Sequence, residues 1–359
     1  MRITFIVPSL NVTGGLRVIS IYATYLSKQG HSVTVISPSA PMLRLQDQVK
    51  SLAKNRQLLK NKFDTTFFNQ ATYEVNIIEN SNHVSTKDVP DADIVIATFW
   101  NTAEWIAEFP ASKGKKVYFL QHYEIHPWLP IERVKATLRL PYRKIAVASW
   151  IADIMNKEYG DSDVAVVPNG VDPNLFFATE RIKQNKPTIG FMYSKREFKG
   201  CDLAIEAFNR AQAQITDLQL VVFGPENNIE KQLPNQSQYF YRPAQDKLRE
   251  IYALCDAWLF SSRTEGFGLP ILEAMACHTP VIGTHCGAAP DIITRENGRL
   301  IPIDDIDAMT SCISEIVSLT PQEWLRMSTL AYETSTKWHW QHSCNLFEQN
   351  LFKFLEEAQ

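Results

Sequence analysis

Short β-branched and aromatic runs alternate with helical patterns along the first half of the chain. The first run is Ile3–Ser9. The apolar positions that follow repeat with a helical period over Leu16–Lys28, and Gly30 ends that pattern. Four further runs read as strands: His31–Ser37, Asp93–Phe99, Lys116–Gln121 and Lys144–Ser149. Strand–helix alternation of this kind predicts a doubly wound, parallel-sheet α/β fold.

The same alternation starts again after Val166–Phe176, a stretch rich in proline, asparagine and glycine that is typical of a linker. The second series has strand patterns at Thr188–Ser194, Leu218–Gly224 and Ala257–Ser262 and helical patterns at Cys201–Ala213 and Asp246–Leu254. A chain of 359 residues exceeds the usual size of one hydrophobic core. We therefore expect two Rossmann-like domains, over 1–168 and 169–337, and a C-terminal helix over 338–359 that packs back on the first domain.

Composition and charge narrow the functional class. Hydrophobic residues make up 45% and charged residues 21%, as in ordinary globular proteins, and no apolar run approaches the length of a bilayer span. Residues 1–166 carry 19 Lys and Arg against 15 Asp and Glu, and residues 167–359 carry 17 against 24. This balance does not resemble a nucleic-acid-binding surface, although the first half could face an anionic surface.

The cellular location follows from the start of the chain and from the cysteines. Pro8 ends the first apolar run and no small-residue cleavage site follows, so the run reads as a strand and not as a signal peptide. The six cysteines have neither zinc-site nor paired spacing, which favours free thiols in a reducing cytosol. We expect a cytoplasmic protein that could also reach the inner face of the membrane.

Doubly wound sheets bind ligands at the carboxyl ends of their strands, and four segments of this sequence fall there. The first contains Gly14 and Gly15, between the first strand and the first helix. Glycine lets a ligand approach the backbone, and a helix N-terminus favours an anion. A tight turn is the simpler explanation of the pair, and no third glycine completes a GxGxxG dinucleotide motif.

The second segment is Ser194–Gly200, which follows the first strand of the second series. It brings three cations, Lys195, Arg196 and Lys199, to the start of a helix. Cations at such an edge suit a diphosphate, and an ordinary solvated loop is the alternative.

The third segment, SSRTEGFGLPILEAMA, runs from a strand end through a glycine-rich turn into a helix. Glu265 lies in the turn, and the amides of Gly266, Phe267 and Gly268 are placed to face an anion near the helix N-terminus. Glu273 lies inside the helix with apolar neighbours on nearly every side, where an idle carboxylate would be costly. A vicinal diol such as that of a ribose is a suitable partner for it, whereas a solvent-facing position is the alternative.

The fourth segment is QHYEIHPW, in which His122 directly follows a strand and Glu124 and His126 lie close by. A histidine at that edge is a candidate donor or acceptor, and a structural role is the alternative. The spacing lacks the helical context of a metal site. The two DxD sequences, at 91–93 and 161–163, come at the beginnings of strands, which is the wrong end for a ligand, so we expect surface turns there and no metal requirement.

With these segments in place, the chain resembles the retaining nucleotide-sugar glycosyltransferases of the GT-B superfamily, specifically glycosyltransferase family 4. The resemblance covers nearly the whole chain and is strongest over Gln245–Pro302, where EGFGLPILE looks like the E-x7-E signature of the family. VPNGVD and YALCDAWLFSS are similar to further family segments. The resemblance implies two domains facing a cleft, with an acceptor-binding domain over 1–168 and a nucleotide-sugar-binding domain over 169–337.

The resemblance also implies roles for the residues of the third segment. Glu273 would bind the ribose hydroxyls of the nucleotide. Glu265, with the amides of Phe267, Gly268 and Leu269, would hold the transferred sugar and its phosphate.

Three residues outside that segment receive roles from the resemblance as well. Lys199 would neutralise the diphosphate leaving group, Gly15 would approach it from the first domain, and His122 would contact the donor sugar. The implied reaction retains the anomeric configuration and uses a nucleotide-diphosphate sugar as donor substrate, without a cofactor or a metal.

One position departs from the family pattern. Many relatives carry an arginine just after the glycine of the strand Thr188–Ser194, where this chain has Phe191–Tyr193, and we expect Lys195 or Arg196 to substitute. Base recognition is expected in the segment Tyr241–Ala244, which contains Arg242, and its side chains do not choose among uridine, guanosine, adenosine and thymidine.

The acceptor is expected to be a glycan or a lipid-linked molecule, as in polysaccharide or glycoconjugate biosynthesis. Two basic segments with apolar positions, 47–63 and 133–144, could lie on an anionic membrane, and ordinary solvated helices are the alternative. Three other functions stay open: an oxidoreductase, which the missing GxGxxG disfavours, a non-catalytic sugar-nucleotide- or glycan-binding module, and a sugar phosphorylase or epimerase on the same scaffold.

Overall fold

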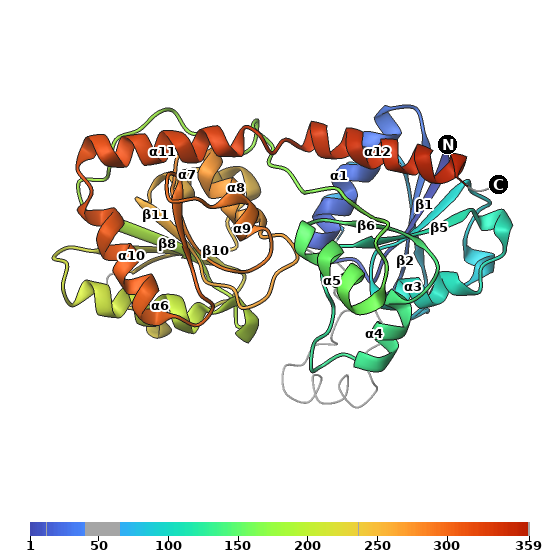
Figure 1. The fold of residues 1–359 in the computed structure, drawn as a ribbon, viewed down its shortest axis with the longest axis horizontal. Coiled ribbons are helices and arrows are strands. Elements are labelled where there is room, and N and C mark those ends of the chain that lie inside the picture. The colour runs from blue at the N-terminus through green and yellow to red at the C-terminus, as the bar shows by residue number, and fades with distance from the viewer. Residues whose placement is uncertain (12, 40–64, 236, 358–359) are drawn as a thin grey trace, which may run out of the picture. The chain divides into compact units, whose positions relative to one another are not determined.

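The computed structural model describes residues 1–11, 13–39, 65–235 and 237–357. They form two compact units, one comprising Met1–Val167 with Cys344–Gln359 and the other comprising Pro168–Ser343. Each unit has a parallel sheet with helices on both faces, as the alternating sequence pattern predicts (Figure 1).

The first unit contains a seven-stranded sheet in the order β3-β2-β1-β4-β5-β6-β7. In chain order its strands are β1 (Arg2–Ile6), β2 (Ser32–Pro38), β3 (Glu74–Ile78), β4 (Ile94–Ala97), β5 (Lys115–Leu120), β6 (Arg143–Ala146) and β7 (Val164–Val166). Its helices are α1 (Gly14–Lys28), α3 (Trp100–Ala107), α4 (Ile131–Leu138), α5 (Ser149–Tyr159) and most of α12 (Trp340–Glu356). Helices α1 and α12 cover one face of the sheet, and α3 and α4 cover the other (Figure 1).

The terminal helix packs on the first unit through Phe347. Its ring stacks on Tyr22 of α1 with 4.3 Å between centroids and meets Phe119 of β5 edge-on at 5.2 Å. All three side chains are almost completely removed from solvent. The prediction that this helix returns to the first domain is therefore confirmed.

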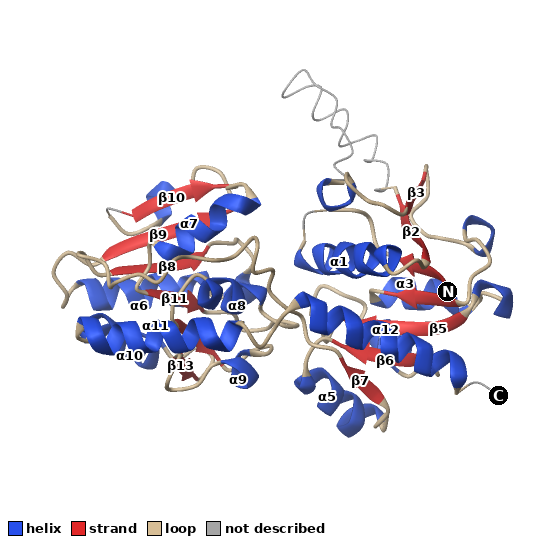
Figure 2. Cartoon of the chain, turned by 90° about the horizontal axis from the view of Figure 1, so that it is seen from above, coloured by secondary structure: helices blue, strands red, loops and turns tan. Residues whose placement is uncertain are grey.

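The second unit contains a six-stranded sheet in the order β10-β9-β8-β11-β12-β13. Its strands are β8 (Thr188–Met192), β9 (Gln219–Gly224), β10 (Ser237–Tyr241), β11 (Ala257–Phe260), β12 (Val281–Thr284) and β13 (Gly298–Ile301). Its helices are α6 (Cys201–Gln212), α7 (Leu248–Ala253), α8 (Leu269–Ala276), α9 (Ala289–Ile292), α10 (Ile306–Ser318) and α11 (Pro321–Ser335). Figure 2 shows the strands of each sheet side by side between their helices.

The boundary of the second unit lies a few residues beyond the expected end at 337. Residues 338–343 belong to the second unit, because the amide of Val171 donates to the carbonyl of Trp338 at 2.8 Å. Gly170 permits this close approach, since a Cβ at that position would lie 2.4 Å from the amide nitrogen of Trp340. The chain therefore enters and leaves the unit through two segments that are bonded to each other.

The other expectations about the chain as a whole can be compared with the described residues. All six cysteines are free, and five of them are buried. In the part of the chain that the structure covers, no helix combines the length and the apolar character needed to cross a membrane. The basic segment 47–63 lies outside the described residues.

Candidate active site

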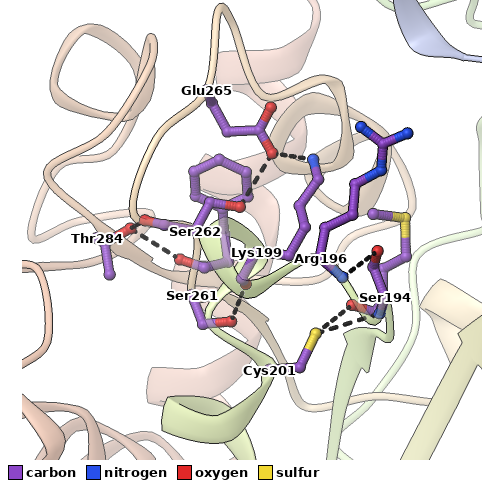
Figure 3. Close-up of polar contacts among 10 residues, drawn as sticks. Ser194, Arg196, Lys199, Cys201, Ser261, Ser262, Glu265 and Thr284 are labelled. Carbon is purple, nitrogen blue, oxygen red and sulfur yellow. Dashed lines mark hydrogen bonds and ion pairs between the residues drawn. The ribbon is translucent and has the colours of Figure 1, made fainter. Parts of the chain in front are cut away.

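The strand order of the second unit reverses between β8 and β11, which is where doubly wound sheets bind ligands. Two segments singled out from the sequence leave the sheet at this point: Ser194–Gly200 after β8 and Ser261–Gly268 after β11. The structure brings them into direct contact, although they are more than 60 residues apart in the chain (Figure 3).

Gly200 allows the two segments to approach closely. Its backbone is left-handed, with φ +60°, and a Cβ at this position would lie 2.0 Å from the carbonyl oxygen of Ser261. The hydroxyl of Ser261 donates to the carbonyl of Lys199 at 3.0 Å. A side chain at position 200 would therefore force apart the two loops that carry the charged groups.

Lys199 and Glu265 form an ion pair at the centre of the contact (Figure 3). Both side chains are largely buried, with 20% and 15% of their surface exposed. The hydroxyl of Ser262 donates to the same Glu265 oxygen at 2.9 Å, and Thr284 of β12 donates to the carbonyl of Ser262 at 2.5 Å. The sequence predicted both charges at this edge, and the structure adds that they contact each other and that the hydroxyl of Ser262 also contacts the carboxylate.

The glycine-rich turn leads directly into helix α8. Gly268 has φ +99°, and a Cβ there would lie 2.8 Å from the ring of Phe260. Phe267 is buried and meets Trp338 edge-on at 5.9 Å, while its carbonyl accepts the amide of Ala288 at 2.8 Å. Leu269 is the first residue of α8, so the amides of Gly266 to Leu269 lie at the positive end of this helix.

Glu273 is buried, with 5% of its surface exposed, so it is not a solvent-facing helix residue. The hydroxyl of Tyr252, from α7, donates to its Oε2 at 2.9 Å. This burial agrees with the apolar neighbours read from the sequence, and the expected role in binding a ribose stays a prediction. Tyr252, a residue of the same unit, is one partner of this carboxylate in the structure.

The remaining donor-site candidates of the second unit are Arg196, Lys195 and Arg242. Arg196 extends beside Lys199, with its guanidinium 5.9 Å from the ring of Phe198 (Figure 3). Lys195 is exposed and lies 3.6 Å from Glu226. Arg242 follows β10 with φ +44° and donates to the carbonyl of Pro225 at 3.1 Å, so the structure does not join it to the ion pair.

The segment Phe191–Tyr193, which stands where relatives carry an arginine, is part of the core. Phe191 and Tyr193 are buried, and the hydroxyl of Tyr193 donates to Gln232 at 2.8 Å. The cations nearest to this segment in sequence, Lys195, Arg196 and Lys199, lie in the loop that follows β8.

The candidates of the first unit lie at the carboxyl edge of the other sheet. Gly14 and Gly15 are the first residues of α1, and a Cβ on Gly15 would lie 3.4 Å from the side chain of Gln121. His122 lies two residues beyond the end of β5. Its Nδ1 lies 2.9 Å from the carbonyl of Tyr123, and its ring lies 4.9 Å from that of His126. These positions agree with the predicted edge of the sheet.

Glu124 is a residue whose environment the sequence did not reveal. It is buried, and it accepts the amide of Trp100, the first residue of α3, at 2.8 Å. Burial raises the pKa of its carboxyl group well above the usual value. Its position four residues beyond a buried strand was the only available signal.

The two DxD sequences lie at the beginnings of β4 and β7, as predicted. Asp91 pairs with Lys113 at 3.0 Å and Asp93 with Arg2 at 2.9 Å. Asp161 pairs with Lys144 at 2.6 Å, and Asp163 pairs with the neighbouring Arg143. No cluster of three or more metal-ligating side chains occurs among the described residues.

Comparisons with known proteins point to one family. Residues 12–175 match the family described as Glycosyltransferase Family 4, and residues 186–318 match Glycosyl transferases group 1. The phosphatidyl-myo-inositol mannosyltransferase of Mycolicibacterium smegmatis is 26% identical over 88% of this chain and 85% of its own length. The N-acetyl-alpha-D-glucosaminyl L-malate synthase of Bacillus anthracis is 30% identical over 40% of this chain, but the match spans only 42% of that relative.

Solved structures agree on the fold. Anabaena HepE in complex with UDP and glucose superposes with a TM-score of 0.77, at 18% identity, over 98% of this chain and all of HepE. The sucrose-phosphate synthase of Thermosynechococcus elongatus gives a TM-score of 0.74, at 16% identity, over the full length of both chains.

Proposed function

Because the chain belongs to the family 4, group 1 glycosyltransferases, we propose that it transfers a sugar, with retention of configuration, from a nucleotide-diphosphate donor to a glycan or lipid-linked acceptor. The observation that carries this proposal is the Lys199–Glu265 pair at the point where the strand order reverses, next to the N-terminus of α8. A cation, a carboxylate and a positive helix end are thereby gathered at a single edge of the sheet.

The chemistry of such a transfer is mainly electrostatic. As the bond between the sugar and the donor phosphate breaks, negative charge accumulates on the diphosphate. Lys199 and the amides at the start of α8 are preorganised to stabilise that charge. Glu265 holds the transferred sugar, and the departing phosphate takes the proton of the attacking acceptor hydroxyl. In this scheme protein cations, with no metal ion, neutralise the leaving group.

The nucleotide would lie along the same edge. Glu273 would accept hydrogen bonds from the ribose, which requires that the diol compete with or join the hydroxyl of Tyr252. Arg196 is the better candidate for a second phosphate cation, since it runs beside Lys199, whereas Lys195 lies near Glu226 (Figure 3). Arg242 would contribute to base recognition after β10.

The first unit would supply Gly15 and His122 to the donor, and it would bind the acceptor. We also propose that the protein contacts the anionic inner face of the cytoplasmic membrane peripherally. Within 133–144, Arg133 is already paired with Glu104 through two hydrogen bonds. Arg139 contacts the ring of Tyr159 and no described carboxylate, which makes it the more available charge.

The donor test is a thermal-shift screen with UDP-, GDP-, ADP- and dTDP-sugars on the wild type, Glu273→Gln and Glu250→Gln. Glu250 lies on the surface of α7 and pairs with Lys247, so it is a matched control. We expect one nucleotide class to raise the melting temperature of the wild type and the control but not of Glu273→Gln. Stabilisation by no donor would contradict the proposal and favour a non-catalytic module.

Catalysis and its stereochemistry need a second measurement. The stabilising donor is incubated with candidate glycan and lipid-linked acceptors in the presence of a chelator, and the product linkage is read by NMR. An inverted linkage or an absolute need for a divalent metal would refute the corresponding part of the proposal.

A further inference from the structure

Arg263 belongs to the loop that follows β11 and is hydrogen-bonded to the other loop of the proposed donor site. The 3₁₀ turn Glu197–Lys199 ends in the cation of the ion pair, and all three of its carbonyl groups accept hydrogen bonds from the segment that follows β11. Glu197 accepts from the guanidinium of Arg263 at 2.7 Å and Phe198 from the Arg263 amide at 2.7 Å. Lys199 accepts from the hydroxyl of Ser261 at 3.0 Å.

The guanidinium of Arg263 is itself fixed by two carboxylates. Asp202, at the start of α6, accepts two hydrogen bonds at 2.9 and 2.7 Å, and Asp304, after β13, accepts one at 2.6 Å. These contacts raise the pKa of Arg263 and lower that of Asp202. Planar, bidentate pairing of this kind fixes direction as well as distance, which a lysine cannot reproduce.

Arg263 therefore joins both halves of the ion pair. It is two residues before Glu265 in one loop, and it binds the backbone of the turn that carries Lys199 in the other. Because each carbonyl of this turn is hydrogen-bonded across to the other loop, these bonds hold the backbone of Lys199 against the loop that carries Glu265.

We propose that Arg263 is a positioning residue that fixes the Lys199 turn against the Glu265 loop and so sets the affinity of the site for a diphosphate. This inference rests on the proposed function of the site. Arg263 does not itself touch the donor in this proposal, since its guanidinium is already bonded to Asp202, Asp304 and Glu197.

The test compares diphosphate with monophosphate binding in the full chain. Calorimetry measures the affinities of four diphosphate and monophosphate pairs (UDP and UMP, GDP and GMP, ADP and AMP, dTDP and dTMP) for the wild type, Arg263→Gln and Arg299→Gln. Arg299 makes a similar two-bond pair with Glu315 in the same unit and serves as the matched control. We expect Arg263→Gln to weaken diphosphate binding about tenfold, as a misplaced binding group does, and monophosphate binding less than about twofold. The control should change neither.

A double-mutant cycle separates positioning from general destabilisation. If Arg263 acts through Lys199, then Arg263→Gln has little further effect on diphosphate affinity in a Lys199→Ala background. Additive losses in the cycle, or equal losses for mono- and diphosphates, would overturn the inference. Should Arg263→Gln not fold, Asp202→Asn and Asp304→Asn each remove one support at an exposed site and should show the same selectivity on a smaller scale.

Different results would contradict the proposed donor site and the proposed role of Arg263. If the wild type binds none of UDP, GDP, ADP and dTDP, the proposed donor site is wrong, and the inference falls with it. If the wild type prefers the diphosphate and Arg263→Gln keeps that preference, only the role of Arg263 is wrong.

Discussion

The substitution Gly200→Ala tests the contact between the two site loops. Alanine would have to adopt the left-handed backbone of this position, φ +60° and ψ +29°, which costs an L-residue about 1–2 kcal/mol. Its Cβ would also lie 2.0 Å from the Ser261 carbonyl oxygen, whereas real Cβ contacts almost never fall below 3.0 Å. The carbonyl must therefore move by about 1 Å, and overpacking of this kind adds about 1–3 kcal/mol.

Gly160→Ala is a matched control, because Gly160 has a similar left-handed backbone, φ +69° and ψ +16°, and its new methyl group would have no atom within 4 Å. We expect Gly160→Ala to lower the free energy of unfolding of its unit by about 1 kcal/mol and Gly200→Ala to lower that of its own unit by about 3 kcal/mol. Pulse proteolysis in urea, with fragments of the two units resolved by mass, measures both values.

Because Gly200 is next to Lys199, we also expect this substitution to affect donor binding. The displaced Ser261 carbonyl belongs to the loop that carries Glu265, so Gly200→Ala should also weaken binding of the stabilising donor. Equal destabilisation by the two substitutions, with unchanged donor binding, would refute the close-contact argument.

Three further predictions concern other parts of the molecule. Phe347→Ala should destabilise the first unit by about 3–5 kcal/mol, measured by urea unfolding, because it empties a fully buried aromatic site; a loss below about 1 kcal/mol would contradict the packing. Glu124 has a folded-state pKa above its unfolded value, so the native state binds the extra proton and stability should fall as pH rises above about 4.5. Glu124→Gln, which keeps an acceptor for the amide of Trp100, should lose this part of the pH dependence in thermal melts from pH 4.5 to 7.5; an unchanged profile would show the carboxyl group to be ionised throughout. A thiol reagent should modify at most Cys312 in the native protein and all six cysteines in urea, since the other five are buried.

The alternation of strands and helices predicted both sheets and placed eight of the thirteen described strands, each to within about three residues. In the second unit, β10, β12 and β13 were not singled out, and these strands are only four or five residues long. In the first unit, the edge strands β3 and β7 were not singled out, because their side chains are only partly buried and β7 has three residues. Their place in the sheet depends on pairing with β2 and β6, which a local pattern does not encode.

The charged groups of the candidate site were predicted one by one, but their contacts were not. Lys199 and Glu265 are 66 residues apart, and only the strand order β8-β11 places their loops side by side. Arg263 stood inside the quoted motif, yet its partners Asp202 and Asp304 come from two other elements. A single sequence shows which residues reach a sheet edge, whereas side-chain partners across that edge require the fold.

The terminal helix has a consequence for the order in which the protein can mature during synthesis. Phe347 completes the core around Tyr22 and Phe119, and the ammonium group of Lys115 donates to the carbonyl of Phe354 near the end of α12. The ribosome makes these residues only after the whole of Pro168–Ser343. The second unit can thus fold as it leaves the ribosome. The first unit keeps the apolar surface around Tyr22 and Phe119 exposed until α12 has been made. Chains that end before Cys344 would expose this apolar surface permanently, and quality-control proteases should degrade them.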